Sequence, residues 1–279
     1  MPLRVLVAGL LPYDSGKTWF SAALLQLAAA RGLRAAGYKP VGGFSAWHNY
    51  PALRESIRDG VLAGGDARIY EQVTGVQVAI LNPVAYATSV PDPTRLRAAT
   101  YMLAMGDLAR TLALWRVSTC RENKHFYSPE ALEASPPLLR TELGRAAEAL
   151  AAEASSREEF LESLNSGELD ETLEACRVEL ETGRDLVIVE SFSSAALPYM
   201  GLDLCGFDFY ALTAPGYVLI YSGERACRAI EFIGAARADK LLASLSRPLL
   251  AEALPPAESI DALAERLRDS RLASILLPG

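Results

Sequence analysis

The sequence predicts an α/β protein with a mostly parallel central sheet, and the first βαβ unit carries that prediction. The run LRVLVAGL at residues 3–10 is short and apolar and contains β-branched residues, as expected of a buried strand. The following TWFSAALLQLAAARG (18–32) has apolar residues at helical spacing and stops at Gly32. LRAAGYKPV (33–41) then returns to a strand pattern. Strand, loop, helix and strand in this order require parallel strands joined by a right-handed crossover.

The next segment is predicted to be helical and then irregular. Residues 51–75 have a helical pattern that is broken at Gly64 and Gly65. Asn82-Pro83, together with Pro91 and Pro93, indicates a long loop rich in turns.

The remainder predicts a helical middle region and a return to the sheet. From about Thr94 to Gly183, Ala, Leu, Glu and Arg dominate, which predicts several helices forming an insertion or a cover on the core. RDLVIVESF (184–192) and GYVLIYSG (216–223) predict two more apolar strands, and a mostly helical segment follows. We therefore expect a single domain over 1–279, with a core at 1–93 and 184–279 and a helical insertion at about 94–183.

Composition excludes several classes of function. The formal net charge of −7 argues against a broad nucleic-acid footprint, which needs a basic face. No apolar stretch reaches the ~20 residues of a membrane span, and the apolar N-terminal run is too short for a signal peptide, so a cytoplasmic protein is expected. The four cysteines lack CxxC spacing and are expected to be small buried residues, not zinc ligands or disulfide partners. They are Cys120, Cys176, Cys205 and Cys227.

A nucleotide site is predicted by GLLPYDSGKT at residues 9–18, which lies between the first strand and the first helix. In a phosphate-binding loop, backbone N–H groups wrap the phosphates, a lysine reaches the β and γ phosphates, and a hydroxyl ligates magnesium. Gly16, Lys17 and Thr18 have these types and this order, although Leu11 stands where the first glycine is usual and Gly9 comes two residues early. The expected nucleotide-binding residues are Asp14, Ser15, Gly16, Lys17, Thr18 and Trp19.

Two further charged residues are expected at the same edge of the sheet. Glu190 ends the apolar strand LVIVE, where a carboxylate could hold a magnesium ion or its waters; the alternative is a charged strand end that meets solvent. Lys39 follows the second strand and could neutralise an anionic substrate; the alternative is a surface lysine before a turn. Lysine is rare here, with Lys124 and Lys240 completing the set, so its use at 17 and 39 suggests a need for a flexible ammonium.

Four blocks of the sequence resemble the dethiobiotin synthetase-like branch of P-loop proteins. VAGLLPYDSGKT is similar to the phosphate loop of that branch, LRAAGYKPVGG to its Gly-Tyr-Lys-Pro-Val turn, and DLVIVES to its Val-Glu-Gly strand. GGDARIYEQVTG, followed by LNPVAYATSVPDP, resembles its Ser-Asp-Ala helix and Asn-Pro segment. The resemblance covers about the first ninety residues and a piece near 190. It implies a three-layer P-loop NTPase fold with a mostly parallel sheet.

The same resemblance implies roles for individual residues. Thr18, Asp66 and Glu190 would surround magnesium, and Lys17 and Lys39 would be catalytic, with Lys39 facing the acceptor. By its local sequence, GGD, Asp66 could instead be a helix N-cap.

The substrate side departs from the family pattern, because the Ser and Thr expected after Val41 are replaced by GGFSAWHNYP. Trp47, His48, Asn49 and Tyr50 therefore become the candidate substrate residues, with a surface loop around a packed tryptophan as the alternative. His125, in the predicted helical region, is expected to have no special role.

These expectations combine into a function. The sequence predicts an enzyme that uses ATP and Mg²⁺ to phosphorylate a carboxylate or carbamate on a small-molecule acceptor, with release of ADP. The alternative is a nucleotide-dependent switch or accessory module with slow hydrolysis. No nucleic-acid or membrane partner is expected, and a homodimer is compatible with the sequence.

Overall fold

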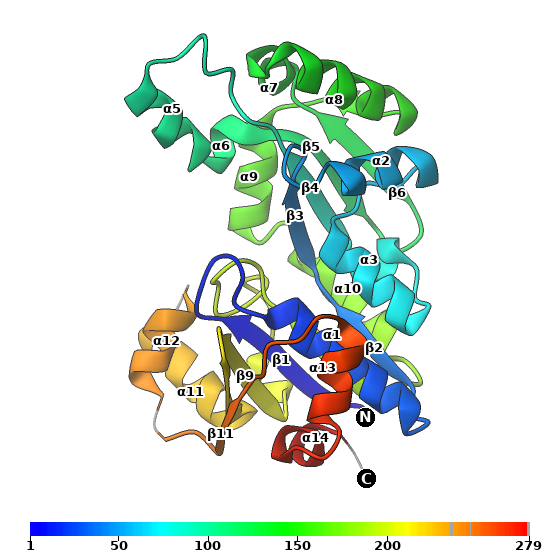
Figure 1. The fold of residues 1–279 in the computed structure, drawn as a ribbon, viewed down its shortest axis with the longest axis vertical. Coiled ribbons are helices and arrows are strands. Elements are labelled where there is room, and N and C mark those ends of the chain that lie inside the picture. The colour runs from blue at the N-terminus through cyan, green and yellow to red at the C-terminus, as the bar shows by residue number, and fades with distance from the viewer. Residues whose placement is uncertain (235–236, 246, 278–279) are drawn as a thin grey trace.

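The structure is a computed structural model that describes residues 1–234, 237–245 and 247–277. It is an α/β protein with many parallel strand pairs, as the sequence predicts, but its strands form two sheets instead of one (Figure 1). The six-stranded sheet has the order β11-β10-β9-β1-β8-β2, and the five-stranded sheet has the order β3-β4-β5-β6-β7.

The six-stranded sheet contains the strands that the apolar runs predict. β1 (Leu3–Gly9) pairs in parallel with β8 (Leu186–Glu190) on one side and with β9 (Phe209–Ala214) on the other. β2 (Ala35–Tyr38) adds in parallel to β8, whereas β10 (Tyr217–Ser222) and β11 (Leu250–Ala253) are antiparallel. Every residue of β8 is buried, which explains why this strand has no polar alternation.

Helices cover this sheet and continue its hydrophobic core. α1 (Lys17–Ala30) contacts β1, β8 and β2 and packs along α13 (Ile260–Leu267). The remaining C-terminal elements are η1 (Leu204–Gly206), α11 (Gly223–Ile233), α12 (Ala238–Ser244) and α14 (Arg271–Leu276). The C-terminal segment is thus mostly helical, as expected, but β9 and β11 were not predicted.

The second sheet corrects two expectations. β4 (Val84–Thr88) occupies the expected loop, because its prolines flank the strand instead of interrupting it. β5 (Leu112–Ser118), β6 (Asn123–Tyr127) and the short β7 (Glu153–Ala154) lie in the region expected to be helical. β5 is buried on both faces and is rich in Leu and Ala, so its pattern resembles that of a buried helix. His125 accordingly lies on a strand, not on a helix.

Helices do form most of the rest of this part of the chain. A break separates α2 (Tyr50–Asp59) from α3 (Gly65–Thr74), as predicted, but it begins at Gly60, the C-cap of α2, and ends at Gly64, the N-cap of α3. α4 (Val78–Leu81) follows. The helices between residues 94 and 183 are α5 (Ala98–Met105), α6 (Leu108–Thr111), α7 (Pro129–Ala134), α8 (Pro137–Ala149), α9 (Arg157–Ser166) and α10 (Asp170–Glu181). The expected division at residue 94 stays a prediction, but strands of the second sheet lie on both sides of it.

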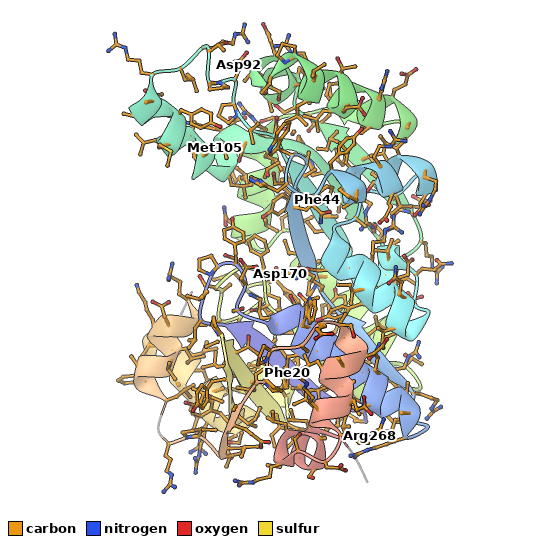
Figure 2. All side chains as sticks on the ribbon, viewed as in Figure 1. Phe20, Phe44, Asp92, Met105, Asp170 and Arg268 are labelled. Atoms are coloured by element: carbon orange, nitrogen blue, oxygen red, sulfur yellow. A yellow bond between two sulfur atoms is a disulfide. The ribbon has the colours of Figure 1, made fainter. Side chains whose placement is uncertain are left out.

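A two-residue junction joins the sheets. β2 ends at Tyr38, and β3 (Val41–Ser45) begins the second sheet after only Lys39 and Pro40. The larger hydrophobic core contains Phe20 and also buried residues of the second sheet, such as Val84 and Trp115, whereas a smaller cluster that includes Phe44 lies within the part of the chain that contains the second sheet (Figure 2). Lys39 lies where the chain passes from the first sheet to the second.

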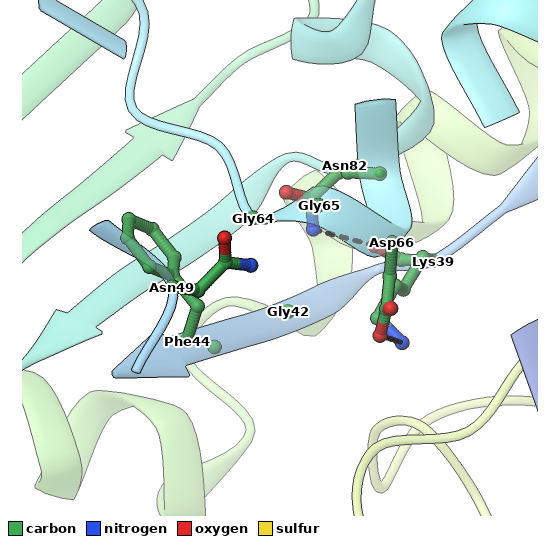
Figure 3. A pocket seen from close by; sticks show the side chains of 10 residues that line it. Lys39, Gly42, Phe44, Asn49, Gly64, Gly65, Asp66 and Asn82 are labelled. Carbon is green, nitrogen blue, oxygen red and sulfur yellow. Dashed lines mark hydrogen bonds and ion pairs between the residues drawn. The ribbon is translucent and has the colours of Figure 1, made fainter. Parts of the chain in front are cut away.

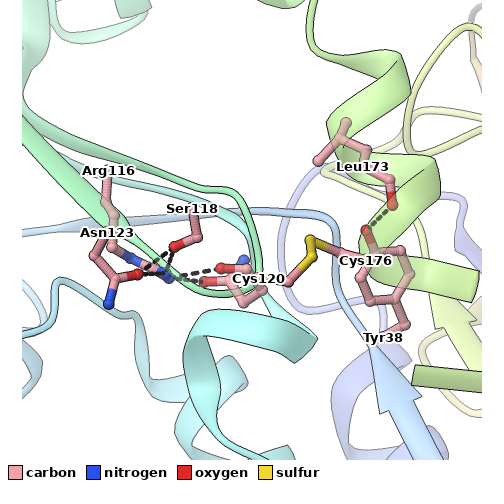
Figure 4. Close-up of a disulfide and its surroundings, with 8 residues drawn as sticks. Tyr38, Arg116, Ser118, Cys120, Asn123, Leu173 and Cys176 are labelled. Carbon is pink, nitrogen blue, oxygen red and sulfur yellow. Dashed lines mark hydrogen bonds between the residues drawn. A yellow bond between two sulfur atoms is a disulfide. The ribbon is translucent and has the colours of Figure 1, made fainter. Parts of the chain in front are cut away.

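The cysteines are paired, which corrects the expectation of isolated buried residues. Cys120, in the turn after β5, is bonded to Cys176 on α10 (Figure 4). Cys205 is bonded to Cys227 on α11. The partners are 56 and 22 residues apart, so short-range spacing gives no sign of the pairing.

Within the described residues, no helix combines the length and the apolar character that crossing a membrane requires.

Loss of the Cys120–Cys176 bridge should destabilise the protein more than loss of the other bridge. A chain-entropy estimate gives about 4 kcal/mol for closing a loop of 56 residues and about 3 kcal/mol for one of 22. Urea unfolding of the double variant Cys120→Ser/Cys176→Ser, beside Cys205→Ser/Cys227→Ser, measures both effects. Equal stability of wild-type protein with and without a reductant would contradict the bridged state.

Candidate functional site

The loop between β1 and α1 folds back so that Ser15 and Lys17 lie close to Gly9, the last residue of β1. Asp14 and Gly16 both have positive φ, and Gly16 is the N-cap of α1. A Cβ atom on Gly9 would lie 2.2 Å from Ser15 Oγ and 2.8 Å from Lys17 Nζ. A side chain at this position would therefore displace Ser15 and Lys17, and glycine leaves room for both at the end of β1. The early glycine of the sequence motif thus has a steric reason.

The start of α1 presents free backbone donors. Within the described parts of the chain, the backbone N–H groups of residues 15–19 donate to no acceptor; the first bond runs from Phe20 N to Gly16 O. The first turn of α1 also contains no acidic residue. Unpaired N–H groups and the helix dipole together favour an anion at this end.

Lys17 extends from this turn toward the end of β8. Its Nζ donates to Ser193 O at 2.7 Å and to Ser15 Oγ at 3.2 Å, and the residue is buried. Burial lowers the pKa of Lys17, against the opposing effect of Glu190. Ser193 itself has a positive φ of 52°, so a strained backbone position supplies the carbonyl that holds this ammonium.

Glu190 is the centre of the cluster and is fully buried. Its Oε1 accepts from Thr18 Oγ1 at 3.1 Å and is paired with Lys39 Nζ, and its Oε2 accepts from the hydroxyl of Tyr70. A buried carboxylate is costly unless it is paired and hydrogen-bonded, and here both oxygens are engaged. A strand end that meets solvent, the alternative for Glu190, is therefore wrong.

Lys39 bridges two carboxylates. Its ammonium lies 3.0 Å from Asp66 Oδ2 while it also pairs with Glu190, and Lys39 is buried, so it is not a surface lysine. Burial disfavours its charge, but Asp66 and Glu190 outweigh this effect and raise the pKa of Lys39. Lys39 in turn lowers the pKa of Asp66, against desolvation.

Asp66 is in the first turn of α3 and is not its cap. The N-cap is Gly64, which makes no side-chain cap bond. A carboxylate at this position still interacts favourably with the helix dipole, and about half of its side-chain surface is exposed, at 51%. Asp66 therefore presents carboxylate surface to solvent beside the buried Lys39–Glu190 pair.

A small pocket of about 50 Å³ opens beside Lys39 and Asp66 (Figure 3). Phe44, Asn49 and Asn82 supply its larger side chains, and Gly42, Gly43, Gly64 and Gly65 also line it. Asn82 is buried, and its Nδ2 donates to Lys39 O at 2.7 Å. The pocket has room for a few atoms only, so it suits a small polar group better than a large apolar one.

The four candidate substrate residues are not gathered at this pocket. Asn49 lines it and also caps α2 by accepting from Ala52 N. Trp47 is exposed, so the alternative of a packed tryptophan is wrong, and His48 is exposed in contact with Ser45 Oγ. The hydroxyl of Tyr50 points to α8, where it donates to Glu142.

Two of the predicted nucleotide residues lie at the exposed rim of the loop. Asp14 is exposed, and Trp19 keeps 38% of its surface accessible.

Three residues that contact the site were not predicted from the sequence: Tyr70, Asn82 and Ser193. Tyr70 carried a usable signal, because it follows Asp66 by four residues and thus shares its face of α3. Ser193 acts through its backbone carbonyl, which every residue has, so the sequence could not indicate its role.

Comparison with known proteins does not assign a family. A scan against models of protein families finds no match, and a search of curated proteins finds no significant one.

Asp66 should contribute stability that depends on pH. Because its pKa is lowered in the folded protein, its contribution is present above the ordinary value of 3.8 and is lost as the pH falls below that value. The difference in free energy of unfolding between wild type and Asp66→Asn should therefore be constant near neutral pH and shrink in acid. Urea unfolding at a series of pH values measures it, and a difference that grows in acid would contradict the Lys39–Asp66 pair.

Proposed function

We propose that the protein catalyses Mg·ATP-dependent phosphorylation of a carboxylate or carbamate acceptor and releases ADP, on a three-layer P-loop fold. One observation carries the proposal: Lys17, Thr18, Lys39, Asp66 and Glu190, from four separate segments, converge at the carboxyl ends of the parallel strands. Ligands of open parallel sheets bind at this edge. The four sequence blocks that resemble dethiobiotin synthetase-like proteins contain the same five residues, which also supports the proposal.

The phosphates would occupy the start of α1. The unpaired N–H groups of residues 15–19 are donors for phosphate oxygens, and Lys17 carries the mobile positive charge. In the structure, Lys17 donates to the carbonyl of Ser193, which is an uncharged acceptor. A phosphate oxygen would take the place of this carbonyl and would be a stronger acceptor because it is charged.

The residues present suit magnesium. Thr18, Asp66 and Glu190 offer only oxygen atoms, the donors that this ion prefers, and the two carboxylates already hold a cationic group, the ammonium of Lys39. When bound, the metal would neutralise charge on the phosphate oxygens. Tyr70 and Thr18 would keep the Glu190 carboxylate oriented.

Lys39 would act at the transferred group. An acceptor oxygen attacks the γ phosphorus, the bond to the β–γ bridging oxygen breaks, and ADP leaves with that electron pair. Because this transfer needs mainly positioning and charge neutralisation, a buried ammonium beside the pocket can stabilise negative charge on the γ-phosphoryl oxygens. The acceptor would enter from the pocket side, where Asn49 can donate a hydrogen bond.

Lys17→Ala should remove ATP turnover, because loss of one charge-stabilising group costs on the order of 3 kcal/mol in the transition state. The measurement is ADP release from Mg·ATP, with and without bicarbonate plus 7,8-diaminononanoate as the first acceptor pair. Lys240→Ala is the matched control, because Lys240 is exposed on α12. Turnover of Lys17→Ala within about tenfold of wild type would show that the loop is wrongly assigned.

Acceptor dependence separates enzyme from switch. Stimulation by the acceptor supports phosphoryl transfer, whereas tight Mg·ATP binding with slow, acceptor-independent hydrolysis supports the nucleotide-dependent switch. Binding itself is measured by thermal unfolding, since Mg·ATP at a hundred times its dissociation constant adds about 2.7 kcal/mol to stability. Absence of stabilisation by both ATP and ADP would rule out either function.

A further inference from the structure

Arg116, in the middle of β5, is a fully buried arginine whose hydrogen bonds converge on the segments that carry the site. Its Nε donates to Leu62 O at 2.8 Å, and its Nη2 donates to Asn82 O at 2.6 Å. Nη1 donates to Ser118 Oγ and, at 3.2 Å, to Asn123 Oδ1 (Figure 4). All three guanidinium nitrogens are therefore satisfied.

This arginine has no carboxylate partner among the described residues. Burial, with a smaller effect from Arg68, lowers the pKa of Arg116 to about 9. Taking a charge out of water without a counter-charge is expensive, and an apolar side chain at a buried strand position would avoid that cost. The planar guanidinium offers what an apolar residue cannot: several donors in fixed directions.

The acceptors show what those donors hold. Asn82, whose carbonyl binds Arg116, uses its own Nδ2 to bind Lys39 O at 2.7 Å. Leu62, whose carbonyl also binds Arg116, lies in the short segment that leads into α3 and Asp66. The N–H of Leu62 donates to His125 Nε2, so both sides of this peptide segment are fixed by the second sheet.

We propose that Arg116 is a positioning residue, which sets where Lys39 and Asp66 lie relative to Glu190 by holding Asn82 and the segment before α3. The second sheet thereby acts on a site whose central carboxylate belongs to the first sheet. The importance of this placement for phosphoryl transfer rests on the proposed function, but the placement itself can be tested without nucleotide.

The test compares Arg116→Met with Arg157→Met. Arg157 is also an arginine of the 94–183 region with a largely buried side chain, but its hydrogen bond goes to Arg110 O, away from Lys39. Both proteins are labelled with [¹³Cε]lysine. The chain has four lysines, so Lys39→Arg identifies the signal of Lys39 in the NMR spectrum.

The spectra are compared at one neutral pH. The Lys39 signal of Arg157→Met should coincide with that of wild type. In Arg116→Met the Lys39 signal should move, because the ammonium loses its fixed place beside Asp66 and Glu190. An unmoved Lys39 signal in folded Arg116→Met would overturn the proposal.

Two further measurements separate positioning from general damage. Stabilisation by Mg·ATP should persist in Arg116→Met, while kcat should fall by about a hundredfold, as expected for a small displacement of catalytic groups. If Arg116→Met does not fold, Asn82→Ala decides, because it removes the bond to Lys39 O and leaves a backbone carbonyl for Arg116. A Lys39 signal at its wild-type position in that variant would overturn the proposal. If wild type binds no nucleotide, the proposed function fails, and the position of the Lys39 signal still decides on Arg116.

Discussion

The burial of one carboxylate, that of Glu190, is the constraint on which the site depends. This side chain has no accessible surface, and it lies at the end of a strand whose residues are all buried. A carboxylate can stay ionised in such a place only if cations and hydroxyl groups come to it. Lys39, Thr18 and Tyr70 do so from three different segments, which fixes the arrangement of α1, α3 and the β2–β3 junction around β8.

The junction of the two sheets follows from the same constraint. Lys39 can reach Glu190 because it comes directly after β2, the neighbour of β8, and it can be held from the other side because β3 enters the second sheet two residues later. Asn82 and Arg116 provide that hold. An exposed ion pair with a similar distance would contribute little to stability. The contribution of a buried ion pair, in contrast, depends strongly on its geometry. Holding Lys39 from both sheets therefore makes its position well defined.

Local sequence patterns predicted the parts of this arrangement that depend on neighbours in the chain. The strand before Gly9, the helix that starts at Lys17 and the apolar strand ending at Glu190 all have clear periodicity and stand where they were expected. β5 was missed because burial on both faces removes the alternation that distinguishes a strand from a buried helix. The contacts of Tyr70 and Arg116 and both disulfides join residues far apart in the sequence, so they become visible only when the chain is folded.

Amide hydrogen exchange with and without Mg·ADP tests the proposed phosphate site most directly, because it reports where a nucleotide binds as well as whether it binds. Binding at the start of α1 should slow exchange at residues 15–19, whose N–H groups have no acceptor within the described residues. Exchange should also slow in the segment after Glu190, which contains the carbonyl that holds Lys17. Protection elsewhere, with these two segments unchanged, would contradict a phosphate site at the start of α1.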